Sequence, residues 1–129
     1  MLKSGILNPQ VNSLLSRVRH TNLLVIADRG FPFWPQIETV DLSLVDDIPR
    51  VLDVLEAVRK NFSIGRFFMA EEFLRRNAEP VVEMFGVAME GAEVVYESHV
   101  EFKRRVPNAI GLIRTGDTTQ YANVILESA

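Results

Sequence analysis

A run of five apolar residues, Leu23-Leu24-Val25-Ile26-Ala27, constrains the fold of this chain more than any other segment. It is too short for a helix, and its apolar residues do not alternate with polar ones, so it predicts a strand buried on both faces. Strands of this kind belong to parallel sheets that carry helices on both sides. The run therefore predicts a layered α/β domain.

Helix signals surround this strand. Asn8 followed by Pro9 is typical of a helix start, and apolar residues at helical spacing then predict a helix that ends at His20. Asp46 or Asp47, followed by Ile48-Pro49, repeats this signal. It predicts another helix that extends to about residue 58. These signals predict one helix before the first strand and another after it.

The rest of the chain alternates strands and helices. Predicted strands cover residues 64–70, 93–97, 109–113 and 121–126. Predicted helices cover residues 71–76, 77–91 with Asn77 as the cap, and 98–105, where Ser98 and Glu101 fit a capping box. The order helix, strand, strand, helix, strand, helix, strand, helix, strand, strand predicts a single three-layer α/β/α domain over residues 1–129, with a mixed, mostly parallel sheet.

Composition excludes several classes of function. The net charge is −3, and the only basic cluster is the short run Lys103-Arg104-Arg105, so neither nucleic acid nor a membrane surface is expected as the partner. With no cysteine, the chain has no disulfide, no thiolate nucleophile and no cysteine metal site. Its start does not resemble a signal peptide, and no apolar run approaches the ~20 residues that span a bilayer, so we expect a cytoplasmic protein.

A polar turn between two apolar runs is the first candidate site. Residues 114–123 hold a cation, a carboxylate, a phenol and an amide, more than a plain connector needs. A turn held between strands is a common support for ligand-binding groups, although an ordinary solvated turn has a similar composition. Gly116 is expected to let the backbone turn.

Both histidines and one aspartate lie at predicted element ends. His20 ends a helix, His99 begins one, and Asp28 directly follows the first strand. Histidine is suited to proton transfer near neutral pH, and ligands in α/β sheets bind beyond the carboxyl ends of strands. Each residue has a simpler interpretation as a helix-end or turn-capping group.

Together these residues resemble the D-ribose pyranase family, whose nearest relatives are the L-fucose mutarotases. The resemblance extends from Leu2 to about Leu126 and rests on four motifs: His20-Thr21, Asp28 with Gly30 and Pro32, His99 with Phe102-Lys103, and Arg114-Thr115-Gly116 leading into Tyr121-Ala122-Asn123.

The resemblance implies a cofactor-independent isomerase without a metal. Its substrate would be a monosaccharide, most simply D-ribose, whose pyranose and furanose forms interconvert by general acid/base ring opening and reclosure. The family pattern implies His20 as the proton donor. It implies sugar binding by Asp28, His99, Lys103, Tyr121 and Asn123, whereas the other turn residues, Arg114, Asp117, Thr118 and Thr119, would shape the loop.

The family also forms ring-shaped homo-oligomers with sites near subunit contacts, a decamer being one candidate size. That leaves open whether Phe31, Phe33 and Trp34 belong to the core or to an interface. Asn22 and Arg29 depart from the family pattern, which has an acidic and a small residue there, and they leave the activity and the preferred sugar open.

Three other functions are compatible with the sequence. An L-fucose-type mutarotase is the nearest, although fucose mutarotases carry an arginine near the position of His99. A non-catalytic sugar-binding accessory of a transport system is the second. A signalling domain with Asp28 as phosphoacceptor is the third, and the lack of clustered acidic residues for Mg²⁺ argues against it.

Overall fold

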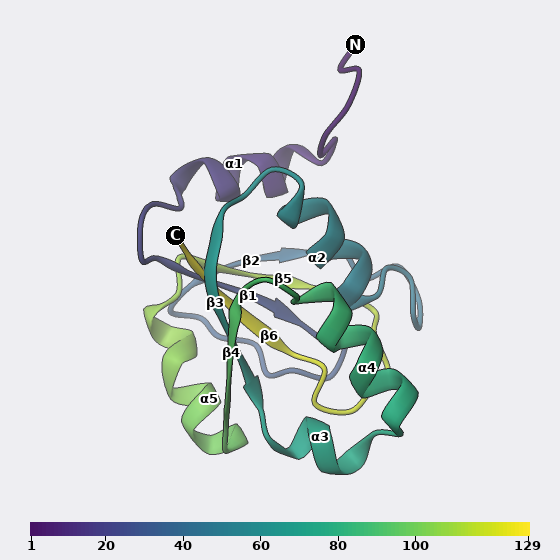
Figure 1. Cartoon of the computed structure of the whole chain (residues 1–129). Coiled ribbons are helices and arrows are strands. Elements are labelled where there is room, and N and C mark those ends of the chain that lie inside the picture. The colour runs from purple at the N-terminus through teal and green to yellow at the C-terminus, as the bar shows by residue number, and fades with distance from the viewer.

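The computed structural model describes all residues from 1 to 129 (Figure 1). The six strands are β1 (Leu23–Ala27), β2 (Glu38–Asp41), β3 (Ile64–Ala70), β4 (Glu93–Glu97), β5 (Gly111–Arg114) and β6 (Val124–Ser128). The helices are α1 (Pro9–Arg17), α2 (Val51–Arg59), α3 (Glu72–Arg76), α4 (Glu79–Ala88) and α5 (His99–Arg105), followed by a 3-10 turn, η1 (Val106–Asn108). The strands predicted at residues 23–27, 64–70 and 93–97 are confirmed.

The six strands form one sheet in the order β2-β5-β1-β6-β3-β4. β1 and β2 both pair with β5 in parallel, and β3 pairs with β4 in parallel. β6 lies between these two groups and is antiparallel to both of its neighbours, β1 and β3. The predicted mixed, mostly parallel sheet is confirmed, with β6 as the one antiparallel strand.

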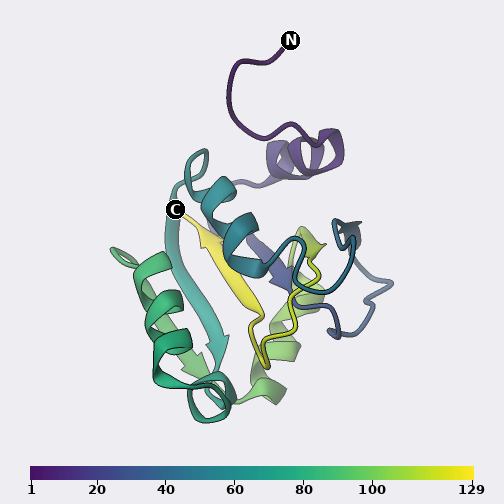
Figure 2. The ribbon, with the colours of Figure 1, turned by 90° about the vertical axis from the view of Figure 1, so that its right-hand side faces the viewer.

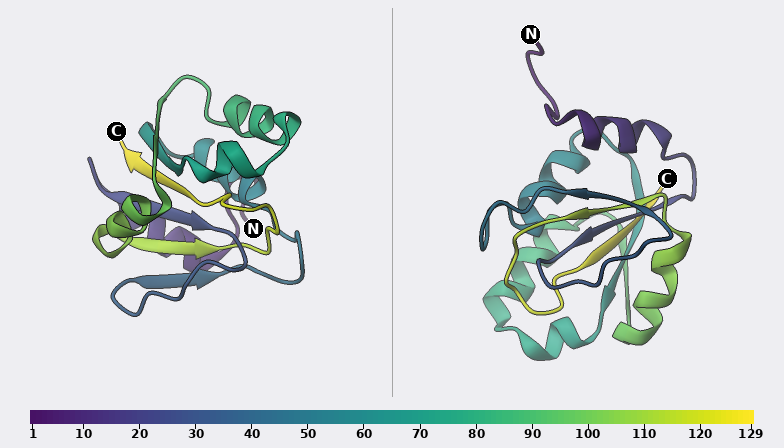
Figure 3. Two further views of the ribbon diagram at one scale, coloured as in Figure 1. Left: turned by 90° about the horizontal axis from the view of Figure 1, so that it is seen from below. Right: turned by 180° about the vertical axis from the view of Figure 1, so that it is seen from behind.

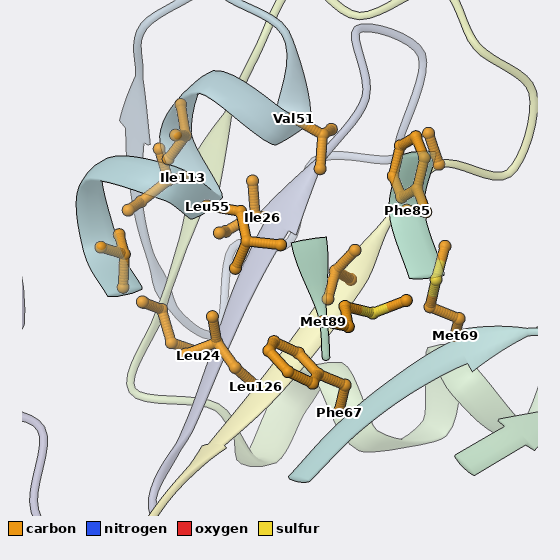
Figure 4. Close-up of a cluster of buried hydrophobic side chains, with 14 of the residues drawn as sticks. Leu24, Ile26, Val51, Leu55, Phe67, Met69, Phe85, Met89, Ile113 and Leu126 are labelled. Carbon is orange, nitrogen blue, oxygen red and sulfur yellow. The ribbon is translucent and has the colours of Figure 1, made fainter. Parts of the chain in front are cut away.

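Helices cover both faces of the sheet, which gives the predicted three layers. α5 lies on one face and α1, α2 and α4 on the other, as the side and rear views show (Figures 2 and 3). Strand side chains alternate between the faces: Leu24 and Ile26 join the core under α2, whereas Val25 and Ala27 join the core under α5. Figure 4 shows the larger core, where Leu55 of α2 packs beside Ile26.

Two of the predicted helix starts are confirmed in atomic detail. The Asn8 side chain accepts a hydrogen bond from the Val11 N–H at 2.9 Å and caps α1. The Ser98 hydroxyl accepts one from the Glu101 N–H at 3.2 Å and caps α5. Each cap satisfies an N–H that has no partner within its helix.

The two helix starts assigned to Asp46 or Asp47 and to Asn77 were wrong. Arg50 is the residue before α2, and the Asp47 carboxylate instead accepts hydrogen bonds from Thr118. Asn77 precedes Ala78, the cap of α4, and its amide donates to the carbonyls of Phe73 and Gln120. In both cases a loop-to-loop hydrogen bond competed with local capping for the side chain.

Three element ends also differ from the expectation. α1 ends at Arg17 rather than at His20, and the turn to β1 places Thr21 at φ 65°. Ala109 closes the η1 turn, so β5 begins only at Gly111. Tyr121 has φ 55°, in the left-handed region, and therefore lies in the turn before β6 rather than in the strand.

No helix combines the length and the apolar character that a membrane crossing requires.

Candidate functional site

Three candidate residues meet at the edge of the sheet that is formed by the carboxyl ends of the parallel strands. Asp28 directly follows β1, and His99 follows β4 after one residue. Asn123 comes directly before β6, which runs in the opposite direction and therefore begins at this same edge. Segments separated by about 95 positions in sequence are thus brought together by the sheet order.

The residues at this edge surround a cavity of about 250 Å³. Its lining consists of Asp28, Gly30, Phe31, Pro32, His99, Gln120, Tyr121 and Asn123. Four of the six predicted site residues are therefore in one cavity of a single chain. Gly30, Phe31, Pro32 and Gln120 were not predicted as lining residues, although each is within four positions of one that was.

Asp28 is held in the cavity from two directions. Its backbone N–H donates to Oδ1 of Asn123 at 2.7 Å, and its own carboxylate accepts a hydrogen bond from the Gly30 N–H at 3.0 Å. Burial raises the pKa of Asp28 above its usual value, against the lowering effect of the Gly30 N–H, the Asn123 side chain and the Phe31 N–H. The result is a fixed carboxyl group that is more basic than a solvated aspartate.

His99 lies among aromatic rings. It stacks on Phe102 with a centroid separation of 6.0 Å, and it meets Phe31 and Tyr121 edge to face at 6.1 and 5.1 Å. Its Nδ1 is buried and has no hydrogen-bond partner within the chain. Burial and the positive charge of Lys103 lower the pKa of His99, so the imidazole is neutral at neutral pH.

The polar turn before β6 supports this cavity rather than facing solvent. Thr115 and Asp117 are buried, and the Asp117 carboxylate accepts a hydrogen bond from the Val51 N–H at the start of α2, at 2.9 Å. Arg114 donates to the carbonyls of Asp28, Arg29 and Pro32, which fixes the segment after β1. The expectation that Arg114, Asp117, Thr118 and Thr119 shape the loop is supported by these contacts, by the hydrogen bonds of Thr118 to Asp47 and by that of the Thr119 N–H to Asp117.

Gly116 has a different role from the one expected. Its φ is not in the left-handed region, but the backbone of residues 45–48 passes so close that a Cβ would overlap the Val45 carbonyl oxygen. Gly116 is therefore required by a close approach between two loops and not by a turn conformation.

His20 lies at the opposite edge of the sheet from the cavity. It is exposed and precedes β1, whereas Asp28 follows β1, and the five residues of that strand span about 13 Å. The neighbouring Thr21 N–H donates to the carbonyl of Ser128, at the far end of β6. Within one chain, His20 does not contact the cavity, and Asp28 does not orient it.

Lys103 lies beside the cavity rather than in it. It lines a wider hollow of about 630 Å³ with Phe33, Trp34 and Arg104, and Pro32 borders both spaces. Phe33 is 69 % exposed, and Trp34 is half-buried with an unpartnered Nε1.

The three aromatic residues of this segment divide between core and surface. Phe31 is buried in the core under α5, whereas Phe33 and Trp34 border the wider hollow.

The two departures from the family pattern lie outside the cavity. Arg29 forms an exposed ion pair with Asp46 at 2.7 Å. The Asn22 side chain accepts a hydrogen bond from the Arg19 N–H at 2.8 Å, in the turn that carries His20. Arg29 therefore does not narrow the cavity in this conformation.

A family model for the RbsD/FucU transport protein family matches the chain over residues 1–129. The chain belongs to this family. Among curated members of the RbsD/FucU family, a D-ribose pyranase of Geobacillus kaustophilus is 41 % identical over 128 residues, which cover 99 % of this chain and 93 % of the relative.

Solved structures of the family have the same fold. RbsD of Bacillus subtilis, in complex with D-ribose, is 32 % identical and superposes with a TM-score of 0.93 over 100 % of this chain and 98 % of that one. The fucose mutarotase of Streptococcus pneumoniae, in complex with L-fucose, is 18 % identical and has a TM-score of 0.84, over 99 % and 98 % of the two chains. The second likeness concerns the fold alone.

Proposed function

We propose that this chain is an isomerase that interconverts the pyranose and furanose forms of D-ribose. The observation that carries the proposal is the 250 Å³ cavity in which Asp28, His99, Tyr121 and Asn123 converge, in a chain of the RbsD/FucU family with D-ribose pyranases among its relatives. The cavity is small, and its lining combines the polar groups of Asp28 and Asn123 with the rings of Phe31, His99 and Tyr121. This combination suits a monosaccharide.

The reaction requires only proton transfer. A proton leaves the anomeric hydroxyl while another reaches the ring oxygen, and the ring opens to the aldehyde. A different hydroxyl then attacks the aldehyde carbon and loses its proton, while the aldehyde oxygen gains a proton and becomes the new anomeric hydroxyl of a ring of the other size. A positioned acid/base group accelerates such steps by about 10²–10⁴-fold.

The cavity residues divide the binding of the sugar among them. The Asp28 carboxylate accepts hydrogen bonds from hydroxyl groups, and the Asn123 amide offers a donor next to it. Tyr121 presents an aromatic ring and a phenol. The neutral His99 ring, which lines the cavity beside Phe31 and Tyr121, adds hydrogen-bonding capacity.

His20 supplies the mobile proton, and it does so from a neighbouring copy of the chain. This part of the proposal is supported by the position of His20, exposed at the edge of the sheet opposite to the cavity. We infer a ring-shaped homo-oligomer in which the edge of one copy that carries His20 lies against the cavity of the next. The hollow bordered by Phe33, Trp34 and Lys103 lies beside the cavity, where such a neighbour would sit and where Lys103 would reach the sugar.

Saturation-transfer NMR on D-ribose tests the proposal, because it measures exchange between anomeric signals directly. We expect the unmodified chain to accelerate exchange and His20→Ala to lose the acceleration while keeping the fold and the ribose binding. Binding without exchange in the unmodified chain would instead support a sugar-binding accessory protein. A panel including L-fucose distinguishes the two mutarotase substrates.

A further inference from the structure

Glu72, at the start of α3, contacts the site from outside the cavity. Both carboxylate oxygens accept hydrogen bonds from the backbone N–H of His99, at 3.0 and 3.1 Å. Glu72 follows β3 after one residue and His99 follows β4 after one residue, and β3 and β4 are parallel neighbours. Their ends are therefore adjacent at the same edge of the sheet (Figure 1).

The contact holds the first residue of α5 against α3. A carboxylate on a helix N-terminal N–H is a charge-assisted hydrogen bond, which is stronger than one between neutral groups. The Ser98 hydroxyl already caps this helix through the Glu101 N–H. Glu72 thus makes a second hydrogen-bonding contact at the start of α5, and this contact is to His99, whose ring lines the cavity.

The charge of Glu72 also acts on the His99 ring. Burial and Lys103, on α5, lower the pKa of His99, whereas Glu72, on α3, and Asp28, after β1, raise it. Burial raises the pKa of Glu72 itself, but the N–H groups of His99 and Glu72 and the charge of Arg75 outweigh burial and bring it below its usual value. Glu72 is therefore ionised at neutral pH and partly offsets Lys103.

We propose that Glu72 is a positioning residue for sugar binding and ring interconversion, which fixes the backbone and the charge environment of His99 without contacting the sugar. The proposal rests on the proposed function for its effect on exchange, and on the bidentate contact alone for its effect on His99. Nothing in the sequence pattern separates Glu72 from its neighbours.

The adjacent residue provides a matched control. Glu71 has the same side chain, but it pairs with Arg75 at 3.7 Å and is exposed. Glu71→Gln therefore removes one charge from the same turn without touching His99. Glu72→Gln removes the charge and keeps one oxygen acceptor for the His99 N–H, whereas Glu72→Ala removes both.

The test is an NMR titration of the His99 ring, combined with ribose exchange rates. We expect Glu72→Gln to lower the pKa of His99 and to reduce exchange about tenfold. Glu72→Ala should have larger effects, and Glu71→Gln none. A Glu72→Gln variant that melts earlier but titrates and exchanges like the unmodified chain would overturn the proposal.

The two proposals fail in different ways. If the unmodified chain does not exchange ribose, the proposed function is wrong, but the shift of the His99 pKa in Glu72→Gln still decides whether Glu72 controls that ring. If ribose exchange is present and the His99 titration does not respond, only the role of Glu72 is wrong.

Discussion

The side chain of Asn123 accepts a hydrogen bond from the backbone N–H of Asp28 at 2.7 Å, across 95 positions of the sequence. Asn123 is 3 % exposed, so this bond is shielded from water. It links the start of β6 to the end of β1, which pair antiparallel from Val124 and Ile26 onward. The two residues therefore extend the sheet by one contact into the cavity, and the geometry of the Asp28 carboxyl depends on the register of β6.

We expect two inactive variants to restore activity when they are mixed. His20→Ala lacks the proton donor, and Asp28→Ala lacks the sugar acceptor, but in a mixed oligomer some cavities receive an intact Asp28 from one copy and an intact His20 from its neighbour. Denaturing the two variants together, refolding them and measuring ribose exchange checks this. An inactive mixture that forms oligomers of normal size would mean that His20 and Asp28 of different copies do not act in one site.

Asp28→Asn should stabilise the fold while it weakens binding. Burial raises the pKa of Asp28, so its ionised form is costly in the folded chain, and the amide keeps an oxygen for the Gly30 N–H. We expect a higher melting temperature than that of the unmodified chain at neutral pH. Weaker ribose binding in calorimetry should accompany it.

The size of this effect depends on pH. A raised pKa in the folded state means that the folded chain holds the Asp28 proton to higher pH than the unfolded chain. Its stabilising contribution is present at low pH and is lost as the pH rises through the folded pKa. The advantage of Asp28→Asn should therefore shrink in acid, and an advantage that grows as the pH falls would contradict the assignment.

Two glycines should respond to alanine in opposite directions. A Cβ at Gly116 overlaps the backbone of Val45 and contacts that of Ile48, which cannot move aside as a side chain does. We expect Gly116→Ala to destabilise the fold by roughly 1–3 kcal/mol in urea unfolding and to weaken ribose binding. Gly86, inside α4, has no atom within 4 Å of a Cβ. Gly86→Ala should stabilise the fold by roughly 0.5–1 kcal/mol, and it controls for the loss of backbone freedom.

His99 should make the stability of the fold decrease in mild acid. Burial and Lys103 lower its pKa in the folded state, whereas the unfolded chain has the usual value of about 6.5. The unfolded state then binds the proton more readily, so the contribution of His99 is complete above about pH 6.5 and is lost as the pH falls through the folded pKa. Unfolding free energies of the unmodified chain and His99→Gln, compared at several pH values, measure this. A difference that does not change between pH 5 and 8 would contradict it.

The sequence predicts the sheet well because the strands carry local signals. The run Leu23–Ala27 is apolar throughout, and its burial on both faces follows from that pattern. The ends of elements are less predictable, because contacts between distant loops decide them. Asp47 has the residue type of a helix cap, but its carboxylate binds Thr118, and the first N–H of α2 donates to the Asp117 carboxylate instead.

The candidate site shows the same division. Asp28, His99 and Asn123 are predictable from residue type, element ends and family resemblance, and the structure brings them together. Glu72 carries no such signal, because its contact with His99 depends on the adjacency of β3 and β4, which the sequence does not specify. The place of His20, at the other edge of the sheet, likewise depends on the length and direction of β1.

The position of β6 also has a consequence for how the sheet is completed during folding. β6 is the last strand of the sequence, yet it is the only link between the group β2-β5-β1 and the pair β3-β4 (Figure 3). Without β6 the two groups are separate half-sheets, and β1 and β3 each have an unpaired edge. Asn123 directly precedes β6, so the docking of this one segment completes both the continuous sheet and a wall of the cavity.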